Sequence, residues 1–156
     1  MDTIIKIIAA IIVFLGMQYF LNYGNAERNE FNEIITSGGL NIFSLRIGDC
    51  LIEPEDVITA NVEAVPCDQF HDLEIFEIFN LNLQSFDLNE INYLATEGCN
   101  MAFEKYVGIK YEESKYYITF FGPTEDGWRT AMDREITCMI YSLDQMPQFS
   151  VQNSGV

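Results

Sequence analysis

The chain has 156 residues and a mass of 17.9 kDa, which suits one domain and is too little for two large ones. Hydrophobic residues make up 49% of it and aromatic residues 13%, more than a disordered chain contains, so a packed core is expected. The 24 Asp and Glu against 8 Lys and Arg give a net charge of −16. This charge repels phosphate backbones, so no nucleic acid is expected as a partner.

Residues 1–26 are predicted to be a membrane anchor or signal segment. The run from Ile4 to Leu21 is apolar with Lys6 as its one charge, and it is just long enough to span a bilayer. Lys6 and the amino terminus, offset by Asp2, leave a weak positive charge at the start of the chain. This charge favours a cytoplasmic start, so the chain is expected to be single-pass with its C-terminal domain outside the cytoplasm. Gly24 and Ala26 also fit a signal-peptidase site. Secretion after cleavage near Ala26 therefore stays open as the alternative.

The next segments are predicted from their periodicity. Residues 27–36 have apolar residues at near-helical spacing and are followed by Ser37-Gly38-Gly39, so residues 27–40 are predicted to be a stalk with a flexible joint. Strands are predicted over 41–47, 57–65, 73–79, 116–121 and 136–143, the third of them central in the sheet because its apolar residues fall on both faces. The folded domain is thus expected over 41–144, with a flexible polar tail over 145–156.

One long helix is predicted over residues 88–107. Asp87 and Glu90 form a capping box before it, apolar residues recur along it at steps of three and four, and Gly108 can end it. The order of strands, helix and strands predicts an α+β domain whose mainly antiparallel sheet is covered by this helix. A small barrel with an appended helix is the alternative.

Four cysteines in a small exported domain predict two disulfides. Spacing alone allows three pairings of Cys50, Cys67, Cys99 and Cys138. Their places in the predicted elements favour Cys50–Cys67 between two strand ends and Cys99–Cys138 between the helix and the last strand. A metal site made from Cys50, Cys67 and His71 is the competing interpretation, which the missing two-residue cysteine spacings disfavour. Neither a metal nor another cofactor is expected.

Several motifs between residues 43 and 142 resemble the septum-formation family of bacterial envelope proteins. They are Leu45-Arg46-Ile47-Gly48-Asp49-Cys50-Leu51, Val65-Pro66-Cys67-Asp68 and His71-Asp72-Leu73-Glu74-Ile75-Phe76, followed by Cys99, Trp128, Asp133-Arg134 and Cys138. The Gly-Asp-Arg triplet that tends to follow the tryptophan in that family is replaced here by Met132-Asp133-Arg134, one residue further along.

The resemblance implies a membrane-tethered or secreted module associated with the division septum, with no established reaction. Its partners would be the bacterial membrane, through the N-terminal helix, and unidentified envelope or division proteins. The residues that match the family's motifs are expected to have structural roles, and they are Gly48, Asp49, His71, Glu74, Trp128, Asp133 and Arg134.

His71 is the only histidine and could act as a general base beside Asp72 and Glu74. No nucleophile elbow or phosphate-binding loop accompanies it, so a structural role is favoured, with the ring donating to a backbone carbonyl or pairing with an acid. Glu74 is expected to pair with Arg46 or Arg134. A local ion pair is expected between Asp133 and Arg134.

Aromatic residues cluster at Tyr116, Tyr117, Phe120, Phe121 and Trp128. We favour the interpretation that these aromatic residues belong to a core beneath the helix. The alternative is that they form an exposed interaction patch or a carbohydrate-binding surface.

These patterns favour a non-catalytic extracytoplasmic interaction module. The alternative is an envelope enzyme or metal-binding protein centred on His71 with Asp72, Glu74 or Cys67.

Overall fold

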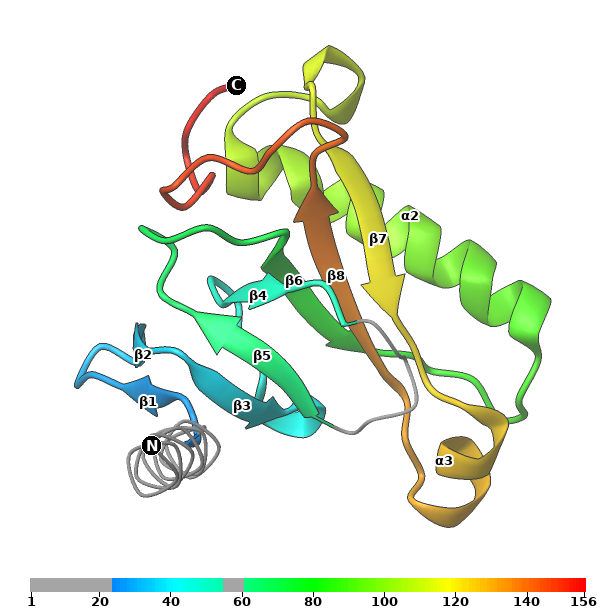
Figure 1. Ribbon diagram of the computed structural model, residues 1–156. Helices are drawn as coiled ribbons and strands as arrows, with labels where there is room; N and C mark the ends of the chain where they lie inside the picture. The colour runs from blue at the N-terminus through cyan, green and yellow to red at the C-terminus, as the bar shows by residue number, and fades with distance from the viewer. Residues whose placement is uncertain (1–23, 55–60) are drawn as a thin grey trace, which may run out of the picture.

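The computed structural model describes residues 24–54 and 61–156 of the chain. Figure 1 shows one twisted sheet with a long helix along one face and a small hairpin beside the sheet's N-terminal strand. The six strands lie in the spatial order β3 (Gly38–Asn41), β5 (Asn61–Val65), β4 (Cys50–Ile52), β6 (Leu73–Asn80), β8 (Glu135–Tyr141) and β7 (Tyr117–Phe121). Each neighbouring pair is antiparallel. The predicted α+β class with an antiparallel sheet is confirmed.

The remaining elements are short apart from the helix α2 (Leu88–Val107). They are the hairpin strands β1 (Glu27–Arg28) and β2 (Ile34–Thr36), the 3₁₀ turns η1 (Ile42–Ser44) and η2 (Tyr111–Glu113), and the helix α3 (Glu125–Thr130). The predicted membrane helix lies in residues 1–23, outside the described residues. In the part of the chain that is described, no helix has the length and apolar character needed to cross a bilayer.

Local signals account for α2, whose boundaries agree with the prediction. The Asp87 carboxylate accepts hydrogen bonds from the backbone N–H groups of Asn89 and Glu90, at 2.9 and 3.2 Å. Gly108 ends the helix with φ at 95°, a left-handed conformation that costs glycine little. Between these ends, α2 turns its apolar face towards the sheet.

Two apolar clusters occupy the two faces of the sheet. On the helix side, Ile91, Ala95 and Phe103 of α2 pack with Phe76 of β6 and Ile136 of β8. On the other side, the strand residues Leu51, Ile75 and Met139 pack with Ile34 of the hairpin and Leu45. The strand β6 contributes to both clusters because successive strand residues point to opposite faces. As predicted, it lies inside the sheet, between β4 and β8.

Both expected disulfides are present. Cys50–Cys67 joins β4 to the loop after β5, and Cys99–Cys138 joins α2 to β8, with Cα–Cα distances of 5.3 and 5.6 Å. The second disulfide fastens the helix to β8, which lies between β6 and the edge strand β7.

The stalk predicted over residues 27–40 is wrong, since this segment is part of the domain. Ile34 of β2 is buried against the sheet, and Gly38–Asn41 is the edge strand β3. Gly38 is required by close packing: a Cβ there would collide with the backbone at Gly24 and Ala26, which runs alongside β3. The apolar residues Phe31, Ile34 and Ile35 are spaced in a way that fits a hairpin as well as a helix, so their spacing did not distinguish the two.

Two other segment predictions are also corrected. Residues 41–47 contain the 3₁₀ turn η1 in place of a strand, because the Asn41 side chain accepts from the Phe43 N–H and caps the turn. The tail over 145–156 packs against the domain through the buried side chains of Met146 and Val151. The predicted strand 57–65 is present as β5, and residues 57–60 lie outside the described residues.

Candidate functional site

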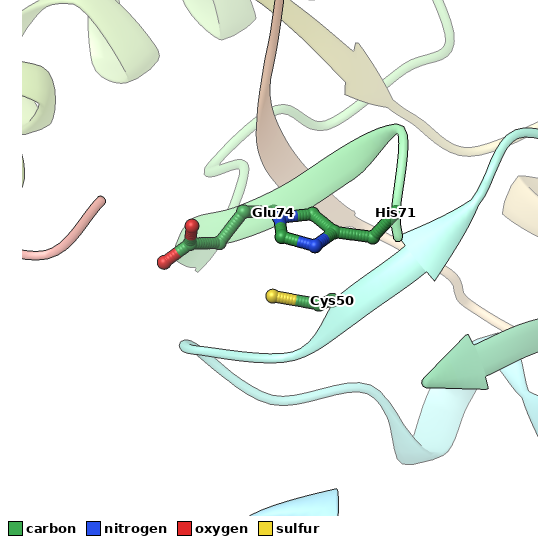
Figure 2. A group of neighbouring side chains, drawn as sticks. All are labelled: Cys50, His71 and Glu74. Carbon is green, nitrogen blue, oxygen red and sulfur yellow. The ribbon is translucent and has the colours of Figure 1, made fainter. Parts of the chain in front are cut away.

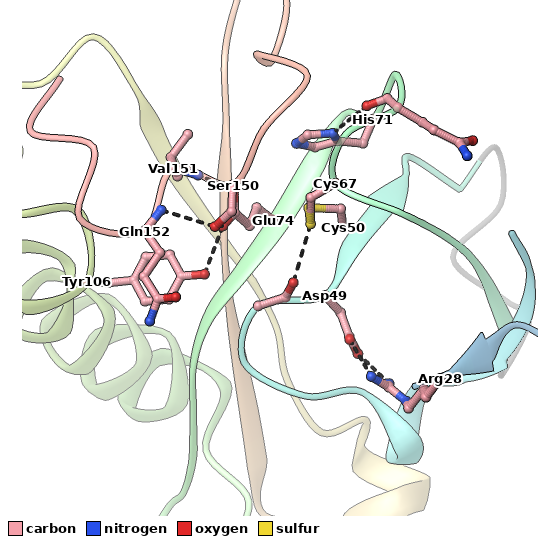
Figure 3. The surroundings of a disulfide bond; sticks show 12 residues. Arg28, Asp49, Cys50, Cys67, His71, Glu74, Tyr106, Ser150, Val151 and Gln152 are labelled. Atoms are coloured by element: carbon pink, nitrogen blue, oxygen red, sulfur yellow. Dashed lines mark hydrogen bonds and ion pairs between the residues drawn. A yellow bond between two sulfur atoms is a disulfide. The ribbon is translucent and has the colours of Figure 1, made fainter. Parts of the chain in front are cut away.

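The family-motif residues gather mainly around the Cys50–Cys67 disulfide, where a buried polar centre lies beside an open groove. Figure 3 shows the hydrogen bonds and ion pairs of this region. Strands β4 and β6 supply Cys50 and Glu74, the loop before β6 supplies His71, and α2 and the tail supply the groups that bind Glu74.

Asp49 ties the hairpin to the start of β4. Its carboxylate receives two hydrogen bonds from the Arg28 guanidinium, at 2.6 and 2.7 Å, and one from the Arg46 backbone N–H at 2.8 Å. A bidentate pair of this kind has a fixed geometry and is stronger than a neutral hydrogen bond. Gly48 precedes it with φ at 92°, which a residue with a Cβ rarely adopts. Sequence reasoning missed Arg28, because 21 residues separate it from Asp49.

His71 is completely buried. Its Nδ1 lies 3.0 Å from the backbone carbonyl oxygen of Gln69. Because a carbonyl oxygen only accepts, Nδ1 carries a proton and donates a hydrogen bond to this carbonyl, which is one of the two structural roles predicted for the ring. Its Nε2 is buried and has no hydrogen-bond partner among the described residues. In the tautomer with its proton on Nδ1 alone, the ring presents the Nε2 lone pair to the interior.

Glu74 is also completely buried, and its partners differ from the prediction. Its Oε1 accepts hydrogen bonds from the hydroxyls of Tyr106 and Ser150, at 2.8 and 2.5 Å, and its Oε2 accepts from the Val151 N–H at 2.8 Å. Burial, and then the negative charge of Glu74, raise the pKa of Tyr106 well above its ordinary value. The phenol therefore remains a hydrogen-bond donor.

The expected partners of Glu74, Arg46 and Arg134, are engaged elsewhere. Arg46 donates to the Asn32 side chain at the hairpin. Arg134 stacks over the Trp128 ring, with its guanidinium carbon 3.4 Å from the ring centroid. Both arginine side chains therefore bind other groups. The Glu74 carboxylate accepts its hydrogen bonds from neutral donors.

Figure 2 shows Cys50 on β4, Glu74 on β6 and His71 in the loop before β6 as neighbouring side chains. The sulfur, a ring nitrogen and a carboxylate oxygen of these three residues all lie within 4.8 Å of one another. Asp72 does not join them, because its carboxylate accepts a hydrogen bond from the Glu53 N–H at 2.9 Å. The dyad of His71 and Asp72 considered from the sequence is therefore not formed.

The groove beside this centre has a volume of about 700 Å³. Its rim carries the exposed side chains of Phe31, Ile35 and Ile47, the first of them 75% exposed. Cys67 lines the groove, whereas Cys50 is completely buried behind it. Polar and charged side chains share the lining, among them Asn32, Glu33, Arg46, Asp68, Gln69, Ser150 and Gln152.

Trp128, Asp133 and Arg134 form a separate cluster. The register of β6 and β8 pairs Leu73 with Tyr141 at one end and Asn80 with Glu135 at the other, so this cluster lies at the opposite end of the strands from His71. Arg134 donates to the backbone carbonyls of Trp128 and Asp133, at 3.1 and 2.7 Å.

The predicted ion pair between Asp133 and Arg134 is wrong. The Asp133 carboxylate accepts instead from the Glu135 N–H at 3.0 Å, while Arg134 stacks on the indole ring. Met132, which stands before them, has φ at 54°, a left-handed turn conformation. These residues stabilise the connection between α3 and β8.

The aromatic cluster divides between the two faces. Tyr116 and Trp128 are buried in the helix-side core, which is the favoured interpretation. Tyr117 is 40% exposed and packs on Tyr141, with ring centroids 5.5 Å apart.

Comparisons with known proteins agree with the motifs. Residues 47–154 match the protein-family model described as "Septum formation". The chain is 28% identical over 108 residues to an uncharacterized membrane protein of Mycobacterium tuberculosis strain CDC 1551 / Oshkosh, and equally to one of strain ATCC 25618 / H37Rv. The alignment covers 61% of this chain and 23% of each relative, so the chain spans less than a quarter of the length of these curated relatives. No solved structure matches.

Proposed function

The chain belongs to the septum-formation family, and on that basis we propose that it is a non-catalytic, membrane-anchored interaction module of the bacterial envelope. The module acts outside the cytoplasm and takes part in septum formation by holding an envelope or division protein in its groove. The groove beside the Cys50–Cys67 disulfide is the observation that carries this proposal.

An extracytoplasmic location is supported by the two disulfides, which persist in oxidising compartments. The matched relatives are named membrane proteins, and the apolar run from Ile4 to Leu21 has the length of a spanning helix. In this proposal residues 1–26 hold the domain at the outer surface of the membrane.

A non-catalytic role is supported by the burial of the polar centre. His71 and Glu74 are both completely buried, so neither side chain contacts a molecule in the groove. The hydrogen bond of His71 fixes the loop before β6, and those of Glu74 link β6 to α2 and to the tail. These are structural roles.

The groove suits a polypeptide segment that has both apolar and basic side chains. Phe31, Ile35 and Ile47 offer apolar contacts to a partner, and aromatic residues such as phenylalanine are enriched in protein interfaces. Glu33 and Asp68 line the same groove, and the net charge of −16 attracts a basic partner over longer distances.

The test is a pair of substitutions in the full-length chain, expressed as an envelope-compatible fluorescent fusion in the native bacterium. Phe31→Asp places a charge on the rim of the groove, and we expect it to abolish enrichment at the septum by weakening partner binding about tenfold or more. Met101→Asp is the matched control, because Met101 is 78% exposed on α2, on the opposite face of the sheet. Melting temperatures establish that both variants are folded.

Two results would contradict the proposal. One is a wild-type fusion spread evenly over the membrane. The other is a folded Phe31→Asp variant that is enriched at the septum as strongly as Met101→Asp.

A further inference from the structure

The buried centre has a second property that does not depend on a partner protein bound in the groove. Cys50, His71 and Glu74 bring a sulfur, a nitrogen and an oxygen within 4.8 Å of one another, and all three side chains are completely buried. Groups of these three types are the ligands found in zinc sites of proteins. The Cys50 sulfur is bonded to Cys67, so it is not available as a thiolate in this state.

His71 is already oriented as a metal ligand. Its Nδ1–H donates to the Gln69 carbonyl, an arrangement that fixes the ring and leaves the Nε2 lone pair free. Histidine ligands of metals are held in this way by a backbone carbonyl or carboxylate. The Nε2 atom has no hydrogen-bond partner among the described residues, and leaving a buried polar atom unsatisfied is unfavourable. A metal ion would satisfy it.

Glu74 has an acceptor position that no donor occupies among the described residues. Three donors bind its two oxygens, which together have about four acceptor positions, so one position remains. Those three donors are neutral, and neither ion pair found within residues 24–54 and 61–156 involves Glu74. A divalent ion would supply the positive charge that this buried carboxylate lacks.

Reduction would free the third ligand. A thiolate of a small dithiol can reach the Cys67 sulfur from the groove, which Cys67 lines, and form a mixed disulfide with it. The Cys50–Cys67 bond breaks, and Cys50 leaves as a thiolate beside His71. The second thiol of the reductant then displaces Cys67, so that two electrons enter the protein and the reductant leaves as a disulfide.

We propose that reduction of the Cys50–Cys67 disulfide creates a zinc site in which Cys50 Sγ, His71 Nε2 and a Glu74 carboxylate oxygen bind the ion. Three protein ligands leave the fourth position of a tetrahedral site exchangeable. The module thereby acquires a metal-bound state under reducing conditions.

The substitution Cys67→Ser tests the site without any reductant, because it leaves Cys50 as a free thiol at its place in β4. Cobalt(II) serves as the probe, since a cobalt–thiolate bond gives a near-ultraviolet absorption band. We expect the detergent-solubilised full-length Cys67→Ser variant to bind one cobalt ion per chain with this band, and zinc to displace it. The oxidised wild-type chain is expected to show no such band.

Ligand variants in the Cys67→Ser background identify the binding groups. His71→Ala and the nearly isosteric Glu74→Gln are each expected to weaken cobalt binding at least tenfold. Glu97→Gln is the matched control, because Glu97 is exposed on α2, and it should leave binding unchanged.

If the Cys67→Ser variant is unfolded without metal, circular dichroism provides the test. Zinc should then restore the helical signal of Cys67→Ser and fail to restore that of Cys67→Ser/His71→Ala. The proposal is overturned by a folded Cys67→Ser variant that binds cobalt no better than oxidised wild type. Equal binding after His71→Ala, or an unfolded Cys67→Ser variant that zinc does not restore, also overturns it. None of these results bears on septal enrichment, which the Phe31→Asp experiment measures.

Discussion

Glu74 joins three parts of the chain at one carboxylate. It lies on β6 and accepts hydrogen bonds from Tyr106 on α2 and from Ser150 and Val151 in the tail. Hydrogen bonds to an ionised group are roughly twice as strong as neutral ones. Because Glu74 is completely buried, each donor that is lost leaves part of the carboxylate unsatisfied in a medium of low dielectric constant.

The substitution Tyr106→Phe removes one of these donors. At pH 7 we expect the free energy of unfolding to fall by about 1–3 kcal/mol, the cost of an unsatisfied buried acceptor. Burial and the charge of Glu74 raise the pKa of Tyr106 in the native state, whereas an unfolded tyrosine ionises near pH 10. The stability that the native phenol contributes is therefore complete below about pH 10 and is lost at higher pH.

The measurement is urea unfolding at pH 7 and at about pH 11. Tyr106→Phe should lose less stability over this interval than the wild type, because it lacks the titrating group. Tyr93→Phe is the control, since Tyr93 is 64% exposed on the same helix, and it should follow the wild type at both pH values. A Tyr106→Phe variant as stable as wild type at pH 7 would show that the hydrogen bond to Glu74 is not formed.

At the scale of elements, the tail acts as part of the domain core. Met146 and Val151 are buried on the helix side, and the tail closes the C-terminal end of α2. The Asn153 N–H donates to the Tyr106 carbonyl and the Gly155 N–H to that of Val107, at 2.7 and 2.9 Å. These bonds satisfy carbonyl groups that the last turn of a helix leaves without partners.

Ending the chain after Asp144 should therefore destabilise the domain. Loss of two buried apolar side chains costs about 3–6 kcal/mol, at about 1.5–3 kcal/mol each. Ending it after Gly155 is the control, because Val156 is 45% exposed. Chemical denaturation compares the two, and equal midpoints would show that the tail contributes nothing to the core.

An element could be predicted when the residues that specify it lie within it or next to it in the sequence. The limits of α2 follow from Asp87, Gly108 and an apolar stripe, all within the helix or next to it. Strand β6 was predicted because its apolar residues fall on both faces of the strand. The hairpin and the tail were predicted wrongly, because Ile34 and Val151 are buried by residues far from them in sequence.

At the scale of the whole molecule, the net charge of −16 opposes compaction. Salt screens repulsion between surface charges over about 10 Å at 0.1 M and about 3 Å at 1 M. We therefore expect the melting temperature to rise by about 4 °C or more between 20 mM and 0.5 M sodium chloride, which corresponds to roughly 1 kcal/mol. Differential scanning calorimetry measures this rise.

The same experiment near pH 4 is the control. The sequence pI is about 4.1, so the net charge and its repulsion are small there. The effect of salt should shrink accordingly. An equal rise at both pH values would mean that salt acts through another mechanism, such as stronger burial of apolar surface.

The amino-acid sequence by itself determined the fold class, the long helix, the family and the number of disulfides, because each has a signal in residue type or local spacing. Only the tertiary structure decided which residues meet at the site. The pairs Arg28–Asp49 and Val151–Glu74 join residues 21 and 77 positions apart, and the path of the chain between them sets their distance. Local periodicity contains no information about that path, so the ion pair, the groove and the buried centre follow from packing alone.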